Sequence, residues 1–148
     1  MIDRVELARN NFLKGYNCAQ AITVAFHDLM GLSEEEAAKM ASPFGAGFGR
    51  MREVCGAVSG MTLVLGCLEG NADPSDKEAK TRIYEREREL LTKFQEAQGS
   101  IICRELLGIR KDAKESATPS DRTAAYYQNR SCLSSVEMAA HILEEYVI

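Results

Sequence analysis

Residues 54–68 read VCGAVSGMTLVLGCL and contain no charged side chain. A helix on a protein surface shows one apolar stripe, whereas a helix that is apolar on all sides is normally buried. Three glycines, Gly56, Gly60 and Gly66, interrupt this run, and each weakens a helix by roughly 1 kcal/mol relative to alanine. We therefore predict a central buried helix over about residues 52–69, in which the glycines let another backbone or a ligand approach closely.

The segment before this helix, residues 44–51, reads FGAGFGRM. Its three glycines do not follow a strand pattern, so a dinucleotide-binding fingerprint is disfavoured. We expect instead a tight turn that lets Cys55 meet a neighbouring backbone. Arg50 and Arg52 flank this turn, where they are either solvated surface residues or groups that stabilise a thiolate or hold an anionic substrate.

Helix start and stop signals occur along most of the chain, whereas strand signals hardly appear. Capping residues and glycine or proline stops predict further helices at residues 3–15, 17–31, 33–42, 75–98, 100–107 and 134–147. Residues 109–131 are polar, contain Pro119 and are typical of a long connection. The sequence thus predicts an all-α, single-domain helical bundle of about six or seven helices over residues 1–148.

The composition excludes several classes of protein. The chain has 148 residues, a net charge of −4 and ordinary apolar and charged fractions of 45% and 27%, which fits one soluble domain. It has no basic patch or nucleic-acid motif, so nucleic acid is not an expected partner. The amino terminus lacks a hydrophobic signal region, and residues 54–68 are too short and too rich in glycine for a membrane span. We therefore expect a cytoplasmic protein.

The five cysteines are distributed unevenly over the predicted helices. Cys18, Cys55, Cys103 and Cys132 fall at helix starts, where free N–H groups and partial positive charge can lower a thiol pKa. In an up-and-down bundle, alternate helix starts share one end, so these four thiols could converge there. Cys67 lies twelve residues beyond Cys55, roughly 18 Å along a helix, and is interpreted as a core or incidental residue.

The order of these cysteines resembles that of a known family. The segment Cys55-Gly56-Ala57-x-x-Gly60, with Cys18 upstream and Cys103 and Cys132 downstream, resembles the signature of the C-GCAxxG-C-C family of redox-active proteins. The resemblance spans nearly the whole chain, and Cys67 is extra to the pattern. It implies a small bacterial or archaeal protein with redox activity.

The leading functional hypothesis is thiol redox chemistry. Two thiols then exchange with a disulfide, or a redox equivalent, through a mixed disulfide. We expect Cys55 to be the attacking thiolate and Cys18 its resolving partner, with Cys103 and Cys132 in the same catalytic cluster. The partner is then an unidentified redox protein or a small-molecule substrate. The absence of a Cys-x-x-Cys pair argues against a thioredoxin-like mechanism.

Three other interpretations of the cysteines stay open. The same four thiolates, Cys18, Cys55, Cys103 and Cys132, could bind a metal ion or an iron–sulfur cluster as cofactor. The cysteines could also be plain buried hydrophobes, or the chain could be a non-enzymatic helical interaction module. The glycine-lined helix would also suit a homo-oligomer interface. His27 and His141 lie nine residues from helix-start cysteines and are not expected to be ligands.

Overall fold

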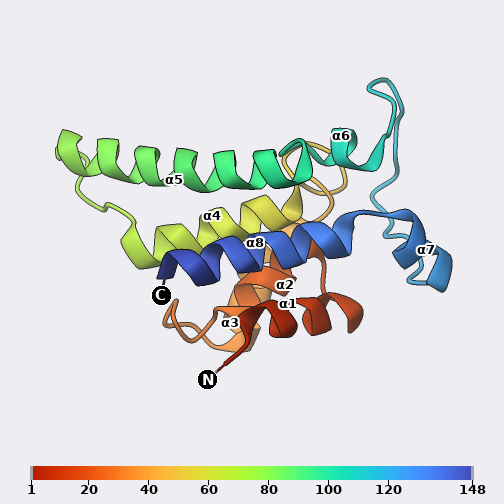
Figure 1. The fold of residues 1–148 in the computed structure, drawn as a ribbon, viewed down its shortest axis with the longest axis horizontal. Helices are drawn as coiled ribbons and strands as arrows, with labels where there is room; N and C mark the ends of the chain where they lie inside the picture. Colours follow the sequence, from red (N-terminus) through yellow and green to blue (C-terminus); the bar gives the residue numbers. More distant parts are fainter. Residues whose placement is uncertain (1, 148) are drawn as a thin grey trace.

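The protein is an all-α helical bundle, seen here in a computed structural model that describes residues 2–147 (Figure 1). The eight α-helices and one 3-10 turn of this part of the chain are α1 (Arg4–Leu13), α2 (Cys18–Ala25), α3 (Glu34–Ala41), η1 (Ser42–Phe44), α4 (Gly56–Glu69), α5 (Lys77–Gln98), α6 (Cys103–Leu107), α7 (Ala124–Asn129) and α8 (Cys132–Val147). The predicted all-α fold class is confirmed, with one helix more than expected.

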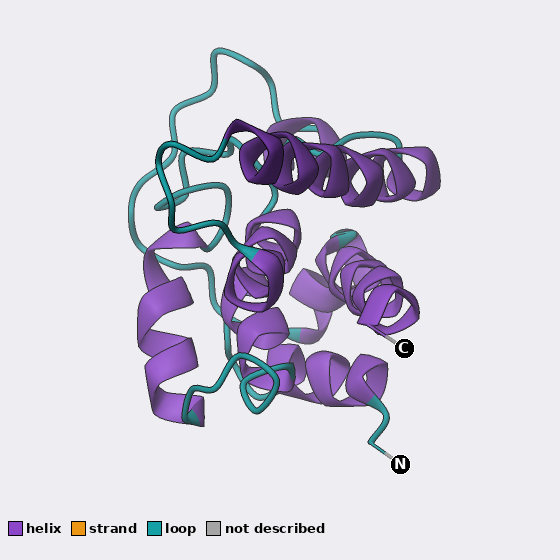
Figure 2. Cartoon of the chain, turned by 90° about the vertical axis from the view of Figure 1, so that its left-hand side faces the viewer, coloured by secondary structure: helices purple, strands orange, loops and turns teal. Residues whose placement is uncertain are grey.

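The helices lie in layers. The long helix α5 lies across the top of Figure 1, α4 and α8 lie beneath it, and α1, α2 and α3 form the lower part. Helix α4 packs against α2, α5 and α8, which explains why residues 54–68 lack charge. Figure 2, coloured by secondary structure, shows the described residues as helices and loops without strands.

The centre of the bundle is shared by two helices. The first half of α4, from Gly56 to Met61, is fully buried, as predicted. In its second half, however, Gly66 and Cys67 are exposed, so the helix is not apolar and buried all round. Every residue of α2 except Gln20 is buried, because α1, α3, α4 and α8 all pack on it. Helix α2 is therefore as central as α4.

Both central helices are shorter than predicted. Helix α4 begins only at Gly56, because Cys55 takes the N-cap position and the residues before it form a loop. Helix α2 ends at Ala25 instead of Gly31, and the chain continues there as turns. The capping box predicted at the start of α2 is present, with the Asn17 side chain accepting from the backbone N–H of the third helical residue.

The region predicted as a long connection contains the additional helix, α7. The Thr123 side chain caps it by accepting a hydrogen bond from the Tyr126 N–H. Helix α8 begins at Cys132, two residues before the predicted cap Ser134. Helix α5 is capped by Asp76 and not by its neighbour Ser75. These shifts leave Cys132 as the first residue of its helix.

The glycines of α4 differ in what surrounds them. A Cβ atom added at Gly60 would lie 2.8 Å from the Ala19 carbonyl oxygen and 2.8 Å from the Ile22 Cβ, both on α2. At Gly66 nothing lies within 4 Å. The prediction that glycines permit a close backbone approach is thus confirmed at Gly60 and wrong at Gly66.

We predict opposite effects on stability for alanine at these two glycines. Overpacking costs typically about 1–3 kcal/mol and outweighs the gain in helix propensity, so Gly60→Ala should lower the free energy of unfolding. Gly66→Ala should raise it by about 0.5–1 kcal/mol, because helix propensity is then the main change. Urea denaturation of the two variants measures both effects. Equal changes in the two variants would contradict the close packing of α2 on α4.

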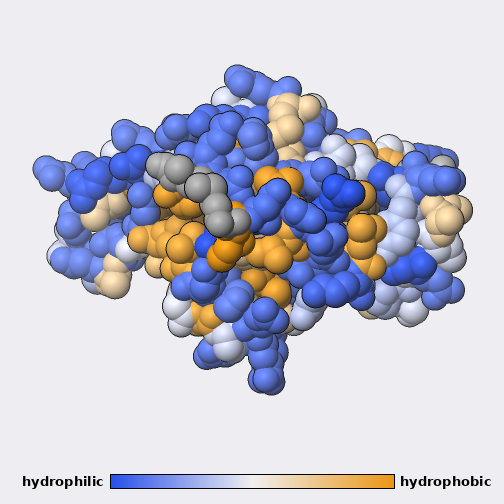
Figure 3. Space-filling view, turned by 60° about the horizontal axis from the view of Figure 1, so that its bottom comes forward, coloured by the Kyte–Doolittle hydropathy of each residue, from blue (hydrophilic) through white to orange (hydrophobic). Residues whose placement is uncertain are grey.

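The surface beneath α1 and α3 carries apolar side chains in its middle (Figure 3). Exposed large hydrophobic residues of the chain include Leu7, Leu13 and Leu29. Within residues 2–147, no helix has both the length and the apolar character needed to cross a membrane. The expected homo-oligomer stays a prediction.

Candidate functional site

One end of the bundle holds a pocket of about 270 Å³. Cys18, Cys55, Cys103 and Cys132 all line it. They stand at the starts of four helices, as the first residue of α2, the N-cap of α4 and the first residues of α6 and α8. The predicted convergence of the four helix starts is therefore confirmed. Cys67 is exposed on α4 and does not belong to this lining, so it is not a core residue.

A short backbone pairing places Cys55 beside Cys103. Val54 and Ile102 form an antiparallel bridge, flanked by hydrogen bonds from the Cys55 N–H to the Ile101 carbonyl (2.8 Å) and from the Cys103 N–H to the Glu53 carbonyl (2.6 Å). Successive side chains in extended backbone point to opposite faces. Cys55 and Cys103 therefore share the face opposite the bridge residues, as diagonal neighbours.

The start of α4 also lies close to Cys18. A Cβ atom at Gly56 would lie 3.0 Å from the Cys18 Cβ and 3.2 Å from the Ala19 nitrogen. To admit a side chain at this position, the neighbouring atoms of α2 would have to give way by a few tenths of an ångström. Gly56 thus performs the predicted role of letting the helix that follows Cys55 approach the helix that begins at Cys18.

Cys18 and Cys132 form an unequal pair of thiols. The hydrogen bond between their side chains is the largest effect on both: it lowers the pKa of Cys132 to about 7 and raises that of Cys18 well above its usual range. Burial raises the pKa of Cys132, whereas the positive charges of Arg130, Arg52 and Arg122 lower it. These opposite directions favour the proton on Cys18 and the negative charge on Cys132.

Cys55 and Cys103 remain protonated at neutral pH. Burial raises the pKa of Cys55 to about 12, although the backbone N–H groups of Val58 and Ala57 act in the opposite direction. Burial also raises the pKa of Cys103, opposed by the hydrogen bond from Arg52. Burial thus argues against a thiolate at Cys55, because the loss of hydration outweighs its position at a helix start; the expected role of Cys55 stays a prediction.

The predicted glycine turn is a run of left-handed backbone. Five consecutive residues, from Ala46 to Arg50, have φ between 54° and 77°, and Arg52 follows with φ 62°. Non-glycine residues avoid this region, at a cost of roughly 1–2 kcal/mol each. Backbone hydrogen bonds hold the loop closed, among them Arg52 N–H to the Ala46 carbonyl (3.2 Å) and Glu53 N–H to the Gly47 carbonyl (3.0 Å). Such strained backbone is characteristic of functional sites.

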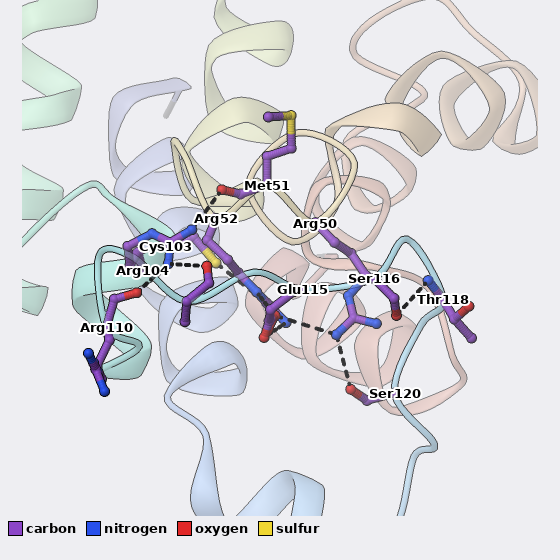
Figure 4. A network of polar contacts seen from close by, with 11 residues as sticks. Arg50, Met51, Arg52, Cys103, Arg104, Arg110, Glu115, Ser116, Thr118 and Ser120 are labelled. Carbon is purple, nitrogen blue, oxygen red and sulfur yellow. Dashed lines mark hydrogen bonds and ion pairs between the residues drawn. The ribbon is translucent and has the colours of Figure 1, made fainter.

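This loop places the Arg52 side chain beside the Cys103 thiol. Its side chain is 2% exposed and donates to both carboxylate oxygens of Glu115, at 2.7 and 3.3 Å (Figure 4). Another guanidinium nitrogen donates to the Cys103 sulfur at 3.7 Å. Arg50 lies 3.6 Å from the same carboxylate and donates to the Ser120 hydroxyl. Glu115 therefore fixes both loop arginines from the segment that follows α6.

That segment covers the pocket and is anchored near both of its ends. Arg104 of α6 donates to the backbone carbonyls of Arg110 and Ala113. Near the other end, Arg122 donates to the carbonyls of Phe12 (2.9 Å) and Tyr16 (3.0 Å) at the carboxyl end of α1. The guanidinium of Arg122 also lies 4.4 Å from the Phe12 ring centroid.

All the charged side chains that line the pocket are arginines, within the part of the chain that the structure describes. They are Arg50, Arg52, Arg122 and Arg130. Sequence reasoning identified Arg50 and Arg52 as candidates but missed Arg122, Arg130 and Glu115, because these three lie in the region interpreted as a connection. The only signal there was a polar segment with two adjacent tyrosines. Tyr126 also lines the pocket, with Arg130 stacked 4.7 Å from its ring centroid.

The histidines have structural surroundings, as expected. Nδ1 of His27 lies 2.8 Å from the Leu32 carbonyl oxygen, and His141 pairs with Glu145 on the surface of α8. Among residues 2–147, no three His, Cys, Asp or Glu side chains are grouped so that they could hold a metal ion. The geometry therefore lends the metal or iron–sulfur hypothesis no support.

The fold and the pocket together define an all-α protein whose four separated cysteines meet at one end of the bundle. Residues 16–146 match the profile of the family described as "Putative redox-active protein (C_GCAxxG_C_C)", and the chain therefore belongs to this family. The chain carries the motif as Cys55-Gly56-Ala57-x-x-Gly60, with cysteine and glycine in the reverse order to the family's label. No curated protein and no solved structure matches the chain.

Proposed function

We propose that the protein is a thiol-dependent oxidoreductase in which Cys132 is the attacking thiolate and Cys18 the resolving thiol. The observation that carries this proposal is the meeting of Cys132 and Cys18 in one pocket, as the first residues of α8 and α2. There the hydrogen bond between them lowers the pKa of Cys132 and raises that of Cys18. Only the thiolate attacks a disulfide, and an attacking thiol works best when its pKa lies near the ambient pH. Both residues line the pocket, where a substrate can reach them.

The reaction balances with a disulfide as the oxidant. The Cys132 thiolate attacks one sulfur of the substrate disulfide, whose S–S bond breaks as the first substrate thiolate leaves and takes up a proton from water. Cys18 then loses its proton and attacks the Cys132 sulfur, which releases the second substrate thiolate. The substrate gains two electrons and two protons, and Cys18 and Cys132 are oxidised to a disulfide.

The pH dependence of alkylation tests the assignment of the thiolate. A lowered pKa means that the thiolate of Cys132 persists down to about pH 7, whereas an ordinary thiol loses it below about 8.5. We expect iodoacetamide to modify Cys132 with a midpoint near pH 7, and Cys55 to stay unmodified under the same conditions. Peptide mapping by mass spectrometry after brief labelling measures this.

The exposed thiol of Cys67 serves as the internal control, because it lies outside the pocket. Its labelling in the same samples gives the reactivity of a thiol that the pocket does not influence. Limited oxidation with a small disulfide should then give a reversible Cys18–Cys132 bond in the wild type and in Cys67→Ser. Labelling of Cys55 before Cys132, or no disulfide between Cys18 and Cys132, would refute the proposed roles.

A further inference from the structure

The pocket and the rest of the chain have opposite electrostatic character. The whole chain carries a net charge of −4. Within the described residues, the charged groups that line the pocket are four guanidiniums, and no Asp, Glu or Lys side chain is among them. A cleft of one sign in a protein of the other sign concentrates oppositely charged ligands and can raise their association rates by about 10–10³-fold. The site therefore selects against a cationic substrate.

The four arginines differ in how far they are already neutralised. Arg50 and Arg52 share the carboxylate of Glu115, and Arg122 is held by backbone carbonyls. Among the described residues, Arg130 has no ion pair with an acidic side chain. Its guanidinium stacks 4.7 Å from the Tyr126 ring centroid, and Arg130 stands two residues before Cys132 in the sequence. Arg130 is thus available to bind an anionic group of a molecule whose sulfur lies at Cys132.

The volume of the pocket limits the size of the substrate that it can hold. Its volume of about 270 Å³ lies just below the roughly 300–1,000 Å³ of typical small-molecule sites. The segment after α6 covers it, since Ala117, Pro119 and Ser120 belong to the lining. This enclosure suits a compact molecule better than a disulfide embedded in a folded protein.

We infer that the substrate of this site is a small disulfide that bears carboxylate or similar anionic groups, bound by Arg130 and Arg50 while its sulfur meets Cys132. This inference rests on the proposed thiol function and adds the substrate class. The exchange proceeds as described above: the anionic disulfide is reduced to two thiols, and Cys18 and Cys132 are oxidised to a disulfide.

Three small disulfides of different charge test the inference. Dithiodipropionic acid is dianionic, hydroxyethyl disulfide is neutral and cystamine is dicationic at neutral pH. The rate at which each oxidises the reduced wild-type protein is followed by acid quenching and mass spectrometry. We expect the dianionic compound to react at least about tenfold faster than the neutral one, and the dicationic compound to react slowest. High salt should reduce these differences.

Arginine variants test which side chains cause the preference for the dianionic disulfide. Arg130→Gln and Arg50→Gln should each lower the ratio of the dianionic to the neutral rate several-fold. This ratio cancels any change in the reactivity of Cys132 itself. Arg82→Gln is the matched control, because Arg82 is exposed on α5 and lines a separate hollow formed with the α4–α5 turn. It should leave the ratio unchanged.

The possible results test the anionic substrate class and the proposed thiol function separately. A neutral disulfide that oxidises Cys18 and Cys132 at the same rate as the dianionic one supports the thiol function and overturns the anionic class. A faster reaction of cystamine overturns it as well. A protein that reacts with none of the three compounds contradicts the proposed function itself. Ratios that fall equally in Arg82→Gln would show that overall charge, and not the pocket, makes the selection.

Discussion

Gly47→Ala should destabilise the protein by about 2–5 kcal/mol and disrupt the arginine loop. A Cβ atom at this position would lie 2.5 Å from the Glu53 nitrogen and 2.7 Å from the Arg52 Cα. These are backbone atoms, which cannot move aside as a side chain can, so we expect an overpacking penalty of about 1–3 kcal/mol. The φ of +77° adds roughly 1–2 kcal/mol for any residue with a side chain.

Gly49→Ala is the control for this prediction. Gly49 has a similar φ of +59°, but nothing lies within 4 Å of an added Cβ. It should therefore lose only the conformational part, about 1–2 kcal/mol. Chemical denaturation of both variants gives the two free energies of unfolding. If Gly47→Ala were no more destabilised than Gly49→Ala, the close return of the loop onto Arg52 and Glu53 would be incorrect.

Cys18→Ala should reduce the reactivity of Cys132 at pH 7 by at least about tenfold. The hydrogen bond from Cys18 is the largest cause of the lowered Cys132 pKa. Without it, burial of Cys132 is opposed only by the nearby arginines, and the pKa should move from about 7 towards 9. Each unit of that rise lowers the thiolate population at neutral pH by up to about tenfold. Alkylation rates measured across the pH range report the new midpoint.

Two further variants make this result specific. Cys18→Ser keeps a hydroxyl donor beside Cys132, so it should retain part of the lowered pKa. Cys67→Ala removes a remote, exposed thiol and should leave the titration of Cys132 unchanged. An unaltered midpoint in Cys18→Ala would mean that the arginines alone hold the Cys132 thiolate.

The convergence of the thiols was predictable because it depends on local signals. Capping residues and glycine stops locate helix starts to within a few residues, and the alternation of helix directions then places those starts at one end. The capping box at Asn17 shows how directly this works, since both of its hydrogen bonds are present. The errors at α4 and α8 moved the boundaries by only a few residues and left Cys55 and Cys132 at helix starts.

The pKa values of the four thiols were not predictable in the same way. Helix-start position is a local property, whereas the pKa values follow from burial and from neighbours distant in sequence. Cys55 is buried among helices that pack around it, which raises its pKa. Cys132 gains its lowered pKa from Cys18, at the other end of the chain, and from three arginines. No pattern within a short window contains this information.

The left-handed loop was only partly predictable. Its glycines indicated a tight turn, and Gly47 and Gly49 do adopt positive φ. Ala46, Phe48 and Arg50 adopt it too, against their intrinsic preference. Tertiary contacts stabilise this conformation, among them the ion pair of Arg52 with Glu115. Helix α7 was missed because of its length. Its six residues are too few to show the apolar periodicity that marks longer helices.

Because the pKa of Cys132 depends on Cys18, the chemical reactivity of Cys132 depends on the native fold. The two residues stand near opposite ends of the sequence, so the lowered pKa of Cys132 arises only after α8 has been synthesised and docked beside Cys18. In an unfolded or incomplete chain, Cys132 has an ordinary thiol pKa and is mostly protonated at neutral pH. Folding thus shifts the pKa of Cys132 downward and that of Cys55 upward, so under the proposed function an unfolded chain would also lose its attacking thiolate.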